Sequence, residues 1–226
     1  DKGLKLTDRL KLMAKVCDAV AEIHRQGLIH CDLKPQNILV TQLGEPRILD
    51  LGLAQATWAD PSDAVLASMV SEAPGTPEYA APEQRDINIQ YRAQTGWDCY
   101  ALGRILYELL TGHLPDKRQF VAPSQVKADP EHAKKLGFRS EAELRQRFQG
   151  DLDAILRKAL AADPGLRYQE ATVLAGDLRA WLTHYPVSAT PQTRYYQAKL
   201  FVRRNPWWVA LIFVLQTALI ATALYA

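Results

Sequence analysis

The side chains that could do chemistry lie close together in one short segment. His30-Cys31-Asp32-Leu33-Lys34-Pro35-Gln36-Asn37 carries a carboxylate, an ammonium group and an amide, and a second carboxylate follows in Asp50-Leu51-Gly52. Oxygen donors such as Asp and Asn suit magnesium, a hard cation that proteins usually share with water and substrate phosphates. The residue types and their order are those of a phosphoryl-transfer site.

Two short strands are expected to bring Asn37 and Asp50 together. Ile38-Leu39-Val40 and Arg47-Ile48-Leu49 are predicted as strands, joined by a turn that contains Leu43-Gly44-Glu45-Pro46. Because the chain folds back at this turn, Asn37 before the first strand should lie near Asp50 after the second. The pair, rather than either residue alone, predicts the metal site.

Helices are expected on both sides of this segment. Thr7–Gln26 has apolar residues on one helical face and is followed by Gly27. Further apolar stripes predict a helix from Leu102 to Leu110 that Gly112 ends, and two more over Leu152–Leu160 and Leu174–Leu182. Ser140 and Glu143 form a capping box that opens another helix, carrying Leu144 and Phe148; we expect it to be solvated rather than a docking surface.

Composition sets the broad class. The 226 residues, 48% of them hydrophobic, suffice for one compact domain and an appendage, and the net charge of +2 is too balanced to predict nucleic-acid binding. Cys17, Cys31 and Cys99 are odd in number and lack CxxC spacing, which argues against a disulfide framework or a zinc site. Reduced thiols in a cytosolic domain fit this pattern.

The C-terminus has the composition of a membrane span. Residues 207–226 carry no charged side chain, and a helix of this length crosses about 30 Å, the thickness of a bilayer core. Trp207 and Trp208 begin the run, and basic residues precede it, which predicts a cytoplasmic lobe. A buried core helix is the alternative. Residues 186–206, with three prolines, are expected to form a juxtamembrane linker.

Four motifs together resemble one family. His30–Asn37 resembles the catalytic loop of eukaryotic-type protein kinases, and Asp50-Leu51-Gly52 resembles their magnesium-binding Asp-Phe-Gly motif. Gly75–Glu83 resembles the end of the activation segment, and Asp98–Gly103 the start of the central helix. Residues 1–185 therefore resemble a kinase C-terminal lobe, a mainly α fold with a small β-hairpin at the catalytic site.

The resemblance implies a role for each site residue. Asp32 would accept or orient the proton of the substrate hydroxyl, and Lys34 would offset charge on the transferred phosphoryl group. Asn37 and Asp50 would hold Mg²⁺ on the phosphates of ATP. In the same way, Arg167 would form a buried ion pair with Glu83.

Further positions follow from the same resemblance. Leu39 would form the apolar floor under adenine, and Gln36 is expected within the nucleotide site. Lys34 together with Thr76 is the pattern of serine/threonine kinases, so the implied substrates are Ser and Thr hydroxyls of proteins.

Each site residue also has a simpler interpretation. Asp32 could be a turn residue, Asn37 a cap, and Lys34 a solvated surface lysine. We expect His30 to be structural, packing against Leu51 and holding the loop. The other histidines lack metal-type spacing, and solvated or capping roles are expected for them: His24, His113, His132 and His184.

The chain departs from the family pattern at two positions. Cys31 replaces the arginine that usually receives an activation-loop phosphate, so we expect activity not to require a phosphate on Thr57, Ser62, Ser68 or Ser71. Leu51 for Phe keeps an apolar side chain next to the metal ligand.

The nucleotide-clamping lobe is not expected within this chain, because only 29 residues precede His30. We therefore expect a fragment of a longer protein, weak or inactive alone, similar to the bacterial receptor-type serine/threonine kinases of the inner membrane. A homodimer is one candidate assembly. The alternatives are a membrane-tethered pseudokinase or scaffold and a lipid or small-molecule kinase.

Overall fold

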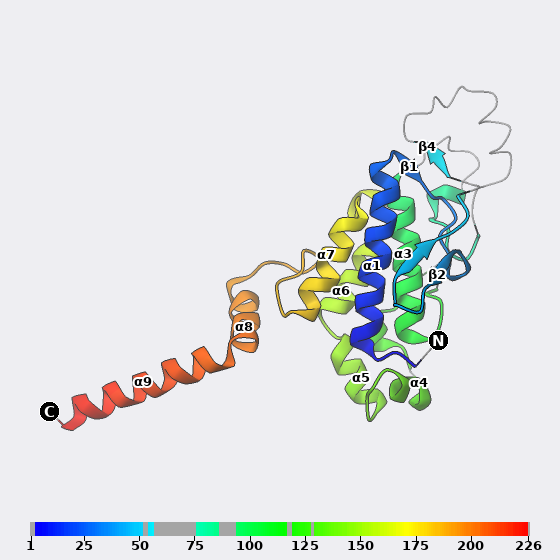
Figure 1. The fold of residues 1–226 in the computed structure, drawn as a ribbon. Helices are drawn as coiled ribbons and strands as arrows, with labels where there is room; N and C mark the ends of the chain where they lie inside the picture. Colours follow the sequence, from blue (N-terminus) through cyan, green and yellow to red (C-terminus); the bar gives the residue numbers. More distant parts are fainter. Residues whose placement is uncertain are drawn as a thin grey trace, which may run out of the picture.

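A computed structural model describes residues 3–51, 54–56, 76–85, 94–116, 119–127 and 129–225. The chain is mainly helical (Figure 1). The α-helices are α1 (Leu6–Arg25), α3 (Thr95–Thr111), α4 (Pro130–Lys135), α5 (Glu141–Phe148), α6 (Asp151–Ala159), α7 (Ala171–Leu182), α8 (Arg194–Arg204) and α9 (Pro206–Tyr225). The strands are β1 (Leu28–Ile29), β2 (Ile38–Val40), β3 (Pro46–Ile48) and β4 (Gln55–Ala56), and short 3-10 turns span Pro35–Asn37, Glu83–Arg85, Pro123–Gln125 and Pro164–Leu166.

The core lies mainly among α1, α3, α6 and α7, and α5 adds Leu144 and Phe148 to it. α1 packs along α7 and α3, while α6 lies between α3 and α7 (Figure 1). α3 is buried along most of its length, and its contact with α6 is so close that a Cβ on Gly103 would lie 2.8 Å from the Cβ of Ala159. Glycine therefore sets the separation of these helices at this point.

Most predicted helix ends lie within three residues of those observed, but α3 begins at Thr95, seven residues before the predicted start at Leu102. α1 begins one residue earlier than expected, and Gly27 follows it with φ +73°. Gly112 ends α3 in the left-handed region, at φ +79°. The capping box is present in part: the Ser140 hydroxyl accepts from the Glu143 amide at 3.2 Å, whereas Glu143 accepts from Arg139 N rather than from the cap itself.

The hairpin forms as predicted, with a shift of one residue in its second strand. β2 pairs antiparallel with β3 in the register Ile38–Ile48, and Leu49 N donates to Asn37 O at 2.8 Å. β1 pairs with β4 in a separate two-stranded sheet, a pairing that the sequence did not predict. Short strands of this kind carry little periodic signal.

The segment after α7 packs on the lobe, although residues 186–206 were expected to be a linker. Val187 is fully buried, and Asp177 accepts from Ser188 N at 2.6 Å and from Ala189 N at 3.2 Å. Leu200, on α8, is also buried. A buried carboxylate on α7 thus fixes the chain that leads to α8, and the packed unit extends past residue 185.

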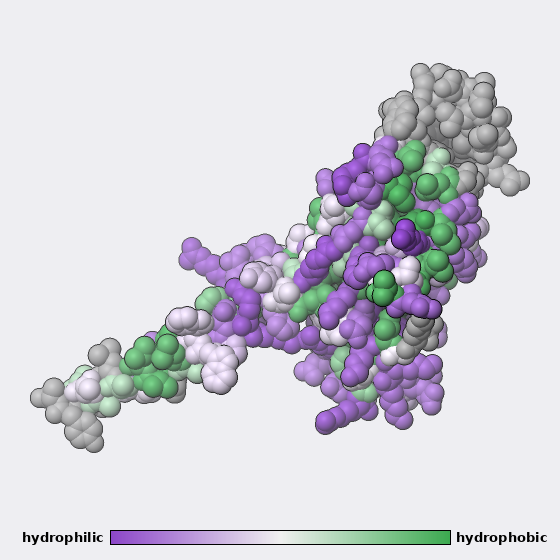
Figure 2. Space-filling model, in the orientation of Figure 1, coloured by the Kyte–Doolittle hydropathy of each residue, from purple (hydrophilic) through white to green (hydrophobic). Residues whose placement is uncertain are grey.

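α9 extends away from the lobe (Figure 1). Its window Pro206–Ala223 has a mean hydropathy of 1.7, and none of it is buried. By length and composition this helix could cross a membrane, and the buried-core alternative does not describe it. Figure 2 shows hydrophobic side chains along α9 beyond a hydrophilic α8 region.

Candidate active site

Asp32, Lys34 and Thr76 form one hydrogen-bonded cluster. Asp32 Oδ1 accepts from Thr76 N at 2.6 Å and from Thr76 Oγ1 at 2.7 Å, and Asp32 Oδ2 accepts from Lys34 Nζ at 2.7 Å. Lys34 Nζ also donates to Thr76 Oγ1 at 2.8 Å. The loop that precedes the β2–β3 hairpin and the segment at Thr76 are far apart in sequence. They nonetheless meet at the carboxylate of Asp32.

The cluster keeps Asp32 ionised. Burial would raise the pKa of this carboxyl, but the hydrogen bonds from Lys34 and Thr76 and the charge of Lys34 outweigh it, so the pKa is lowered. A carboxylate that stays charged can accept a hydrogen bond from a substrate hydroxyl. The surface-lysine interpretation of Lys34 does not fit, because three quarters of its side chain is covered, with an exposed fraction of 25%.

Asn37 is buried beside the same carboxylate. Its Nδ2 donates to Asp32 O at 2.9 Å and to Asp32 Oδ2 at 3.4 Å. Since both bonds use the amide nitrogen, the amide oxygen of Asn37 is directed elsewhere and can serve a hard cation. The side chain also locks the loop around Asp32.

Asp50 lies across the strand pair from Asn37. The bond between Leu49 N and Asn37 O places Asp50 one residue beyond this contact, as the hairpin argument predicted. Asp50 has a φ of +61°, in the left-handed region that costs a non-glycine residue on the order of 1 kcal/mol or more. Such backbone conformations occur preferentially at functional sites, where surrounding contacts fix them.

The donor set fits a cation bound together with phosphates. Among the described residues, no three His, Cys, Asp or Glu side chains form a group that could hold a metal ion. A magnesium ion at this point would therefore rely on Asn37 and Asp50, completed by water and phosphate oxygens, which is the usual manner for Mg²⁺.

The catalytic loop is anchored by Asp98, a residue whose role the sequence analysis did not identify. Asp98, on the first turn of α3, accepts from His30 N at 2.8 Å, from Cys31 N at 3.0 Å, and is 2.8 Å from His24 Nε2. The expectation of a solvated or capping role is wrong for His24, since it is buried against this carboxylate. The sequence offered one sign of this role: a charged residue in the first turn of α3, a helix that the structure shows to be buried along most of its length.

The same contacts hold a strained residue. Cys31 has a φ of +65°, and Gln84 Nε2 donates to its carbonyl at 2.6 Å. Hydrogen bonds from side chains to both the backbone amide and the backbone carbonyl of Cys31 therefore fix a conformation that a non-glycine residue seldom adopts. His30 Nε2 lies 3.0 Å from Leu49 O and joins the loop to the hairpin, which fits the loop-holding role predicted for it, whereas its packing against Leu51 stays a prediction.

Glu83 and Arg167 form the predicted ion pair. Arg167 NH1 and NH2 donate to the two carboxylate oxygens of Glu83 at 2.6 Å and 2.8 Å, and the arginine side chain is 0% exposed. A bidentate pair at this depth fixes the segment after Thr76 to the helical part of the lobe. The activation-segment end is thus held on both sides.

An apolar surface remains open beside the site. Leu39 is 53% exposed and Leu51 is 47% exposed, and Leu43 and Leu49 are also exposed. Figure 2 shows hydrophobic side chains gathered over this part of the lobe. Gln36 is exposed at the 3-10 turn. The adenine role of Leu39 and the nucleotide role of Gln36 stay predictions. Gly52, Gly75 and the hydroxyls of Thr57, Ser62, Ser68 and Ser71 lie outside the described residues.

Comparison with known proteins gives one family. Residues 2–177 match the protein kinase domain. The chain is similar to the serine/threonine-protein kinase PknB of Mycobacterium leprae, with 34% identity over 173 residues, and to PknB of Mycolicibacterium smegmatis, with 35% identity over 173 residues. It is also 32% identical, over 182 residues, to a probable serine/threonine-protein kinase of Streptomyces coelicolor.

The match covers most of this chain but little of each relative. It spans 75% of the chain for the two PknB proteins and 80% for the Streptomyces kinase, and 25% of the length of each relative. The chain therefore spans about a quarter of the curated relatives it matches.

Proposed function

The chain belongs to the protein kinase family, and from that premise we propose that it is the C-terminal lobe of an ATP-dependent kinase that phosphorylates Ser and Thr hydroxyls of proteins. The observation that carries the proposal is the cluster of Asp32, Lys34 and Thr76 next to Asn37. These groups come from separate segments and converge on a single carboxylate.

In this proposal, Asp32 receives the hydroxyl of the substrate. Its ionised oxygens can accept the hydroxyl hydrogen bond and orient the nucleophile, while Lys34 offsets negative charge on the group in transfer. Thr76 holds Asp32 in place through both its amide and its hydroxyl. ATP and Mg²⁺, when bound, would supply the phosphoryl group and neutralise its charge, with Asn37 and Asp50 as the protein ligands.

The exposed apolar surface fits a site that is completed by more chain. Leu39, Leu49 and Leu51 are each more than 40% exposed beside the catalytic cluster. Contiguous exposed apolar residues of this kind usually mark a surface that another part or a ligand covers. We propose that adenine and a nucleotide-clamping lobe cover it, and that the lobe described here transfers phosphate weakly or not at all alone.

The proposed location is the inner membrane, with α9 as a single span and the kinase lobe in the cytoplasm. The unburied apolar α9 and the basic residues of α8 before it support this arrangement. Cys31 at the position of the usual arginine supports activation without a phosphate on the activation segment. A homodimer is a further part of the proposal.

Transfer of radiolabelled phosphate from ATP tests the function, in the full-length protein that contains this lobe. We expect Asp32→Asn to lose transfer to an acceptor protein while it retains ATP binding. We expect Thr76→Ser to keep activity, because the serine hydroxyl can still donate to Asp32 and accept from Lys34. Asp18→Asn, on the surface of α1, is the matched control. Equal transfer by the parent and Asp32→Asn would refute the catalytic assignment.

The same assay separates the alternatives. A pseudokinase would bind ATP without transfer by either the parent or the variants. A lipid kinase would label an organic-soluble product, and a small-molecule kinase would label a water-soluble product that does not precipitate with protein. A protein kinase would instead yield phosphoserine and phosphothreonine, which acid hydrolysis of the labelled protein identifies.

A further inference from the structure

A cavity lies between α8 and the lobe, away from the cluster of Asp32, Lys34 and Thr76. It has a volume of about 830 Å³ and is bounded by α5, α6, the end of α7 and α8. The volume is typical of a small-molecule site. None of the candidate active-site residues lines it, so catalysis does not account for it.

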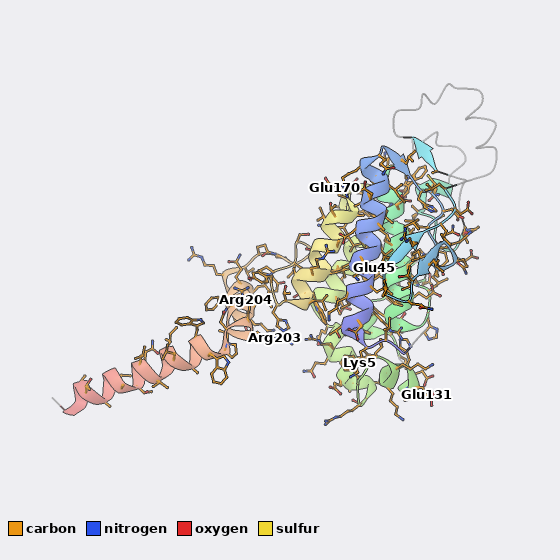
Figure 3. The ribbon with its side chains drawn as sticks, viewed as in Figure 1. Lys5, Glu45, Glu131, Glu170, Arg203 and Arg204 are labelled. Carbon is orange, nitrogen blue, oxygen red and sulfur yellow. The ribbon has the colours of Figure 1, made fainter. Side chains whose placement is uncertain are left out.

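The charges that line this groove are predominantly positive. Its basic side chains are Arg147, Arg157, Lys199 and Arg203. Within the described part of the chain, none of these four is ion-paired with a carboxylate. Two of them come from the lobe and two from α8, so the groove exists only because α8 packs beside the lobe (Figure 3).

Two carboxylates also line the groove, and both already accept hydrogen bonds. Glu143 Oε2 accepts from Arg139 N at 3.0 Å, and Asp151 Oδ1 accepts from Thr190 Oγ1 at 2.9 Å. They serve the helix start and the chain before α8, and four basic side chains against these two carboxylates leave an excess of positive charge in the groove.

The arginines of the groove act on one another, and none of them forms an ion pair within the described residues. Arg147 is half-buried, with its guanidinium 4.2 Å from the ring centroid of Trp181. Burial lowers the pKa of Arg147, and the charge of Arg203 lowers it further. The pKa of His184 is lowered by burial and then by the same two arginines. An anion in the groove would relieve this repulsion.

The position of the groove indicates the source of that anion. Arg203 stands three residues before Pro206, the first residue of α9. If α9 crosses the bilayer, Arg203 and Lys199 lie at headgroup level, where anionic lipids attract basic side chains. We propose that this groove binds the phosphate headgroup of an anionic phospholipid and so fixes the orientation of the lobe on the membrane. The choice of a lipid as the source of the anion rests on the proposed membrane span of α9. The preference of the groove for an anion rests on its charges alone.

Calorimetric titration of the detergent-solubilised chain tests the proposal. The probes are dihexanoyl phosphatidylglycerol, dihexanoyl phosphatidylcholine, inorganic phosphate and a phosphoserine peptide. The two lipids stay below their micelle-forming concentrations, and all probes are used at equal ionic strength. We expect phosphatidylglycerol to bind, and Arg203→Gln to weaken its binding about fivefold, the usual effect of one basic residue near an anionic headgroup.

Arg204→Gln is the matched control. Arg204 is on the same helix (Figure 3) and carries the same charge, but its guanidinium stacks 4.0 Å from the ring centroid of Tyr185 and is not among the side chains that line the groove. We expect this variant to bind phosphatidylglycerol within twofold of the parent chain. The melting temperatures of both variants should equal that of the parent, which excludes unfolding as the cause.

Several results would overturn the proposal. Equal weakening by Arg203→Gln and Arg204→Gln would mean diffuse surface charge rather than a site. Phosphatidylcholine that binds as tightly as phosphatidylglycerol would exclude anion recognition. Inorganic phosphate or a phosphoserine peptide that binds at least as tightly would exclude a lipid ligand. Carbonate extraction of membranes tests the α9 span separately, and phosphate transfer tests the kinase function separately.

Discussion

Asp98 determines the position of the catalytic loop, and Asp98→Asn is the most direct test of that reasoning. The carboxylate is 1% exposed and meets His30 N, Cys31 N and His24 Nε2 at 2.8 to 3.0 Å. An asparagine of the same shape keeps one acceptor oxygen. Whichever way the amide turns, its NH₂ group faces a backbone N–H of the loop, which then has no acceptor.

The expected decrease in the free energy of unfolding follows from the hydrogen bond that Asp98→Asn removes. A hydrogen bond to a charged group contributes about 1.5–3 kcal/mol, and a buried donor left unsatisfied costs a similar amount. We therefore expect the free energy of unfolding to fall by about 1.5–3 kcal/mol. For a chain of this size, about 2–4 °C per kcal/mol gives a decrease of roughly 3–12 °C in melting temperature.

Urea unfolding in mild detergent, followed by circular dichroism, measures this difference. Asp18→Asn is the matched control, because Asp18 also pairs with a cation, Arg179, but is 47% exposed. A surface pair contributes about 0–1 kcal/mol. If Asp98→Asn destabilised the lobe no more than Asp18→Asn, the assignment of Asp98 as the anchor of the loop would be wrong.

Three further outcomes are expected. Arg167→Leu should lower the free energy of unfolding by about 3–5 kcal/mol in urea titrations, because it leaves the carboxylate of Glu83 without its partner; a loss below about 1 kcal/mol would contradict a buried pair. Gly103→Ala should cost about 1–3 kcal/mol, since the new methyl would meet a carbon of α6 at 2.8 Å, whereas Gly176→Ala, with open space around the new methyl, should be neutral or stabilising by up to about 1 kcal/mol; equal effects would refute the close helix contact. The pKa of Asp32 is lowered on folding, so the ionised carboxylate stabilises the lobe above its ordinary pKa and this stability is lost as the pH falls through the folded value. Between about pH 5 and about pH 2, thermal unfolding should show a larger loss for the parent chain than for Asp32→Asn, and parallel curves would argue against the lowered pKa.

The sequence alone determined the features that depend on local order. The helices follow from apolar residues at helical spacing, and Gly27 and Gly112 end α1 and α3 where the backbone needs a positive φ. The hairpin followed from two short apolar runs around a turn, and it implied that Asn37 and Asp50 would lie near each other. The order of the four motifs predicted the family, and the resemblance to that family predicted the Glu83–Arg167 ion pair.

The tertiary structure decided what depends on segments distant in sequence. Thr76 lies 44 residues from Asp32, yet its amide and hydroxyl complete the hydrogen-bonded cluster around that carboxylate. Asp98 reaches the loop across 68 residues, and no local pattern distinguishes a buried anchor from a solvated helix-start acid. The packing of Val187 and Leu200 on the lobe, and with it the basic groove, depends on the buried Asp177, because only the folded lobe brings that carboxylate to the chain before α8.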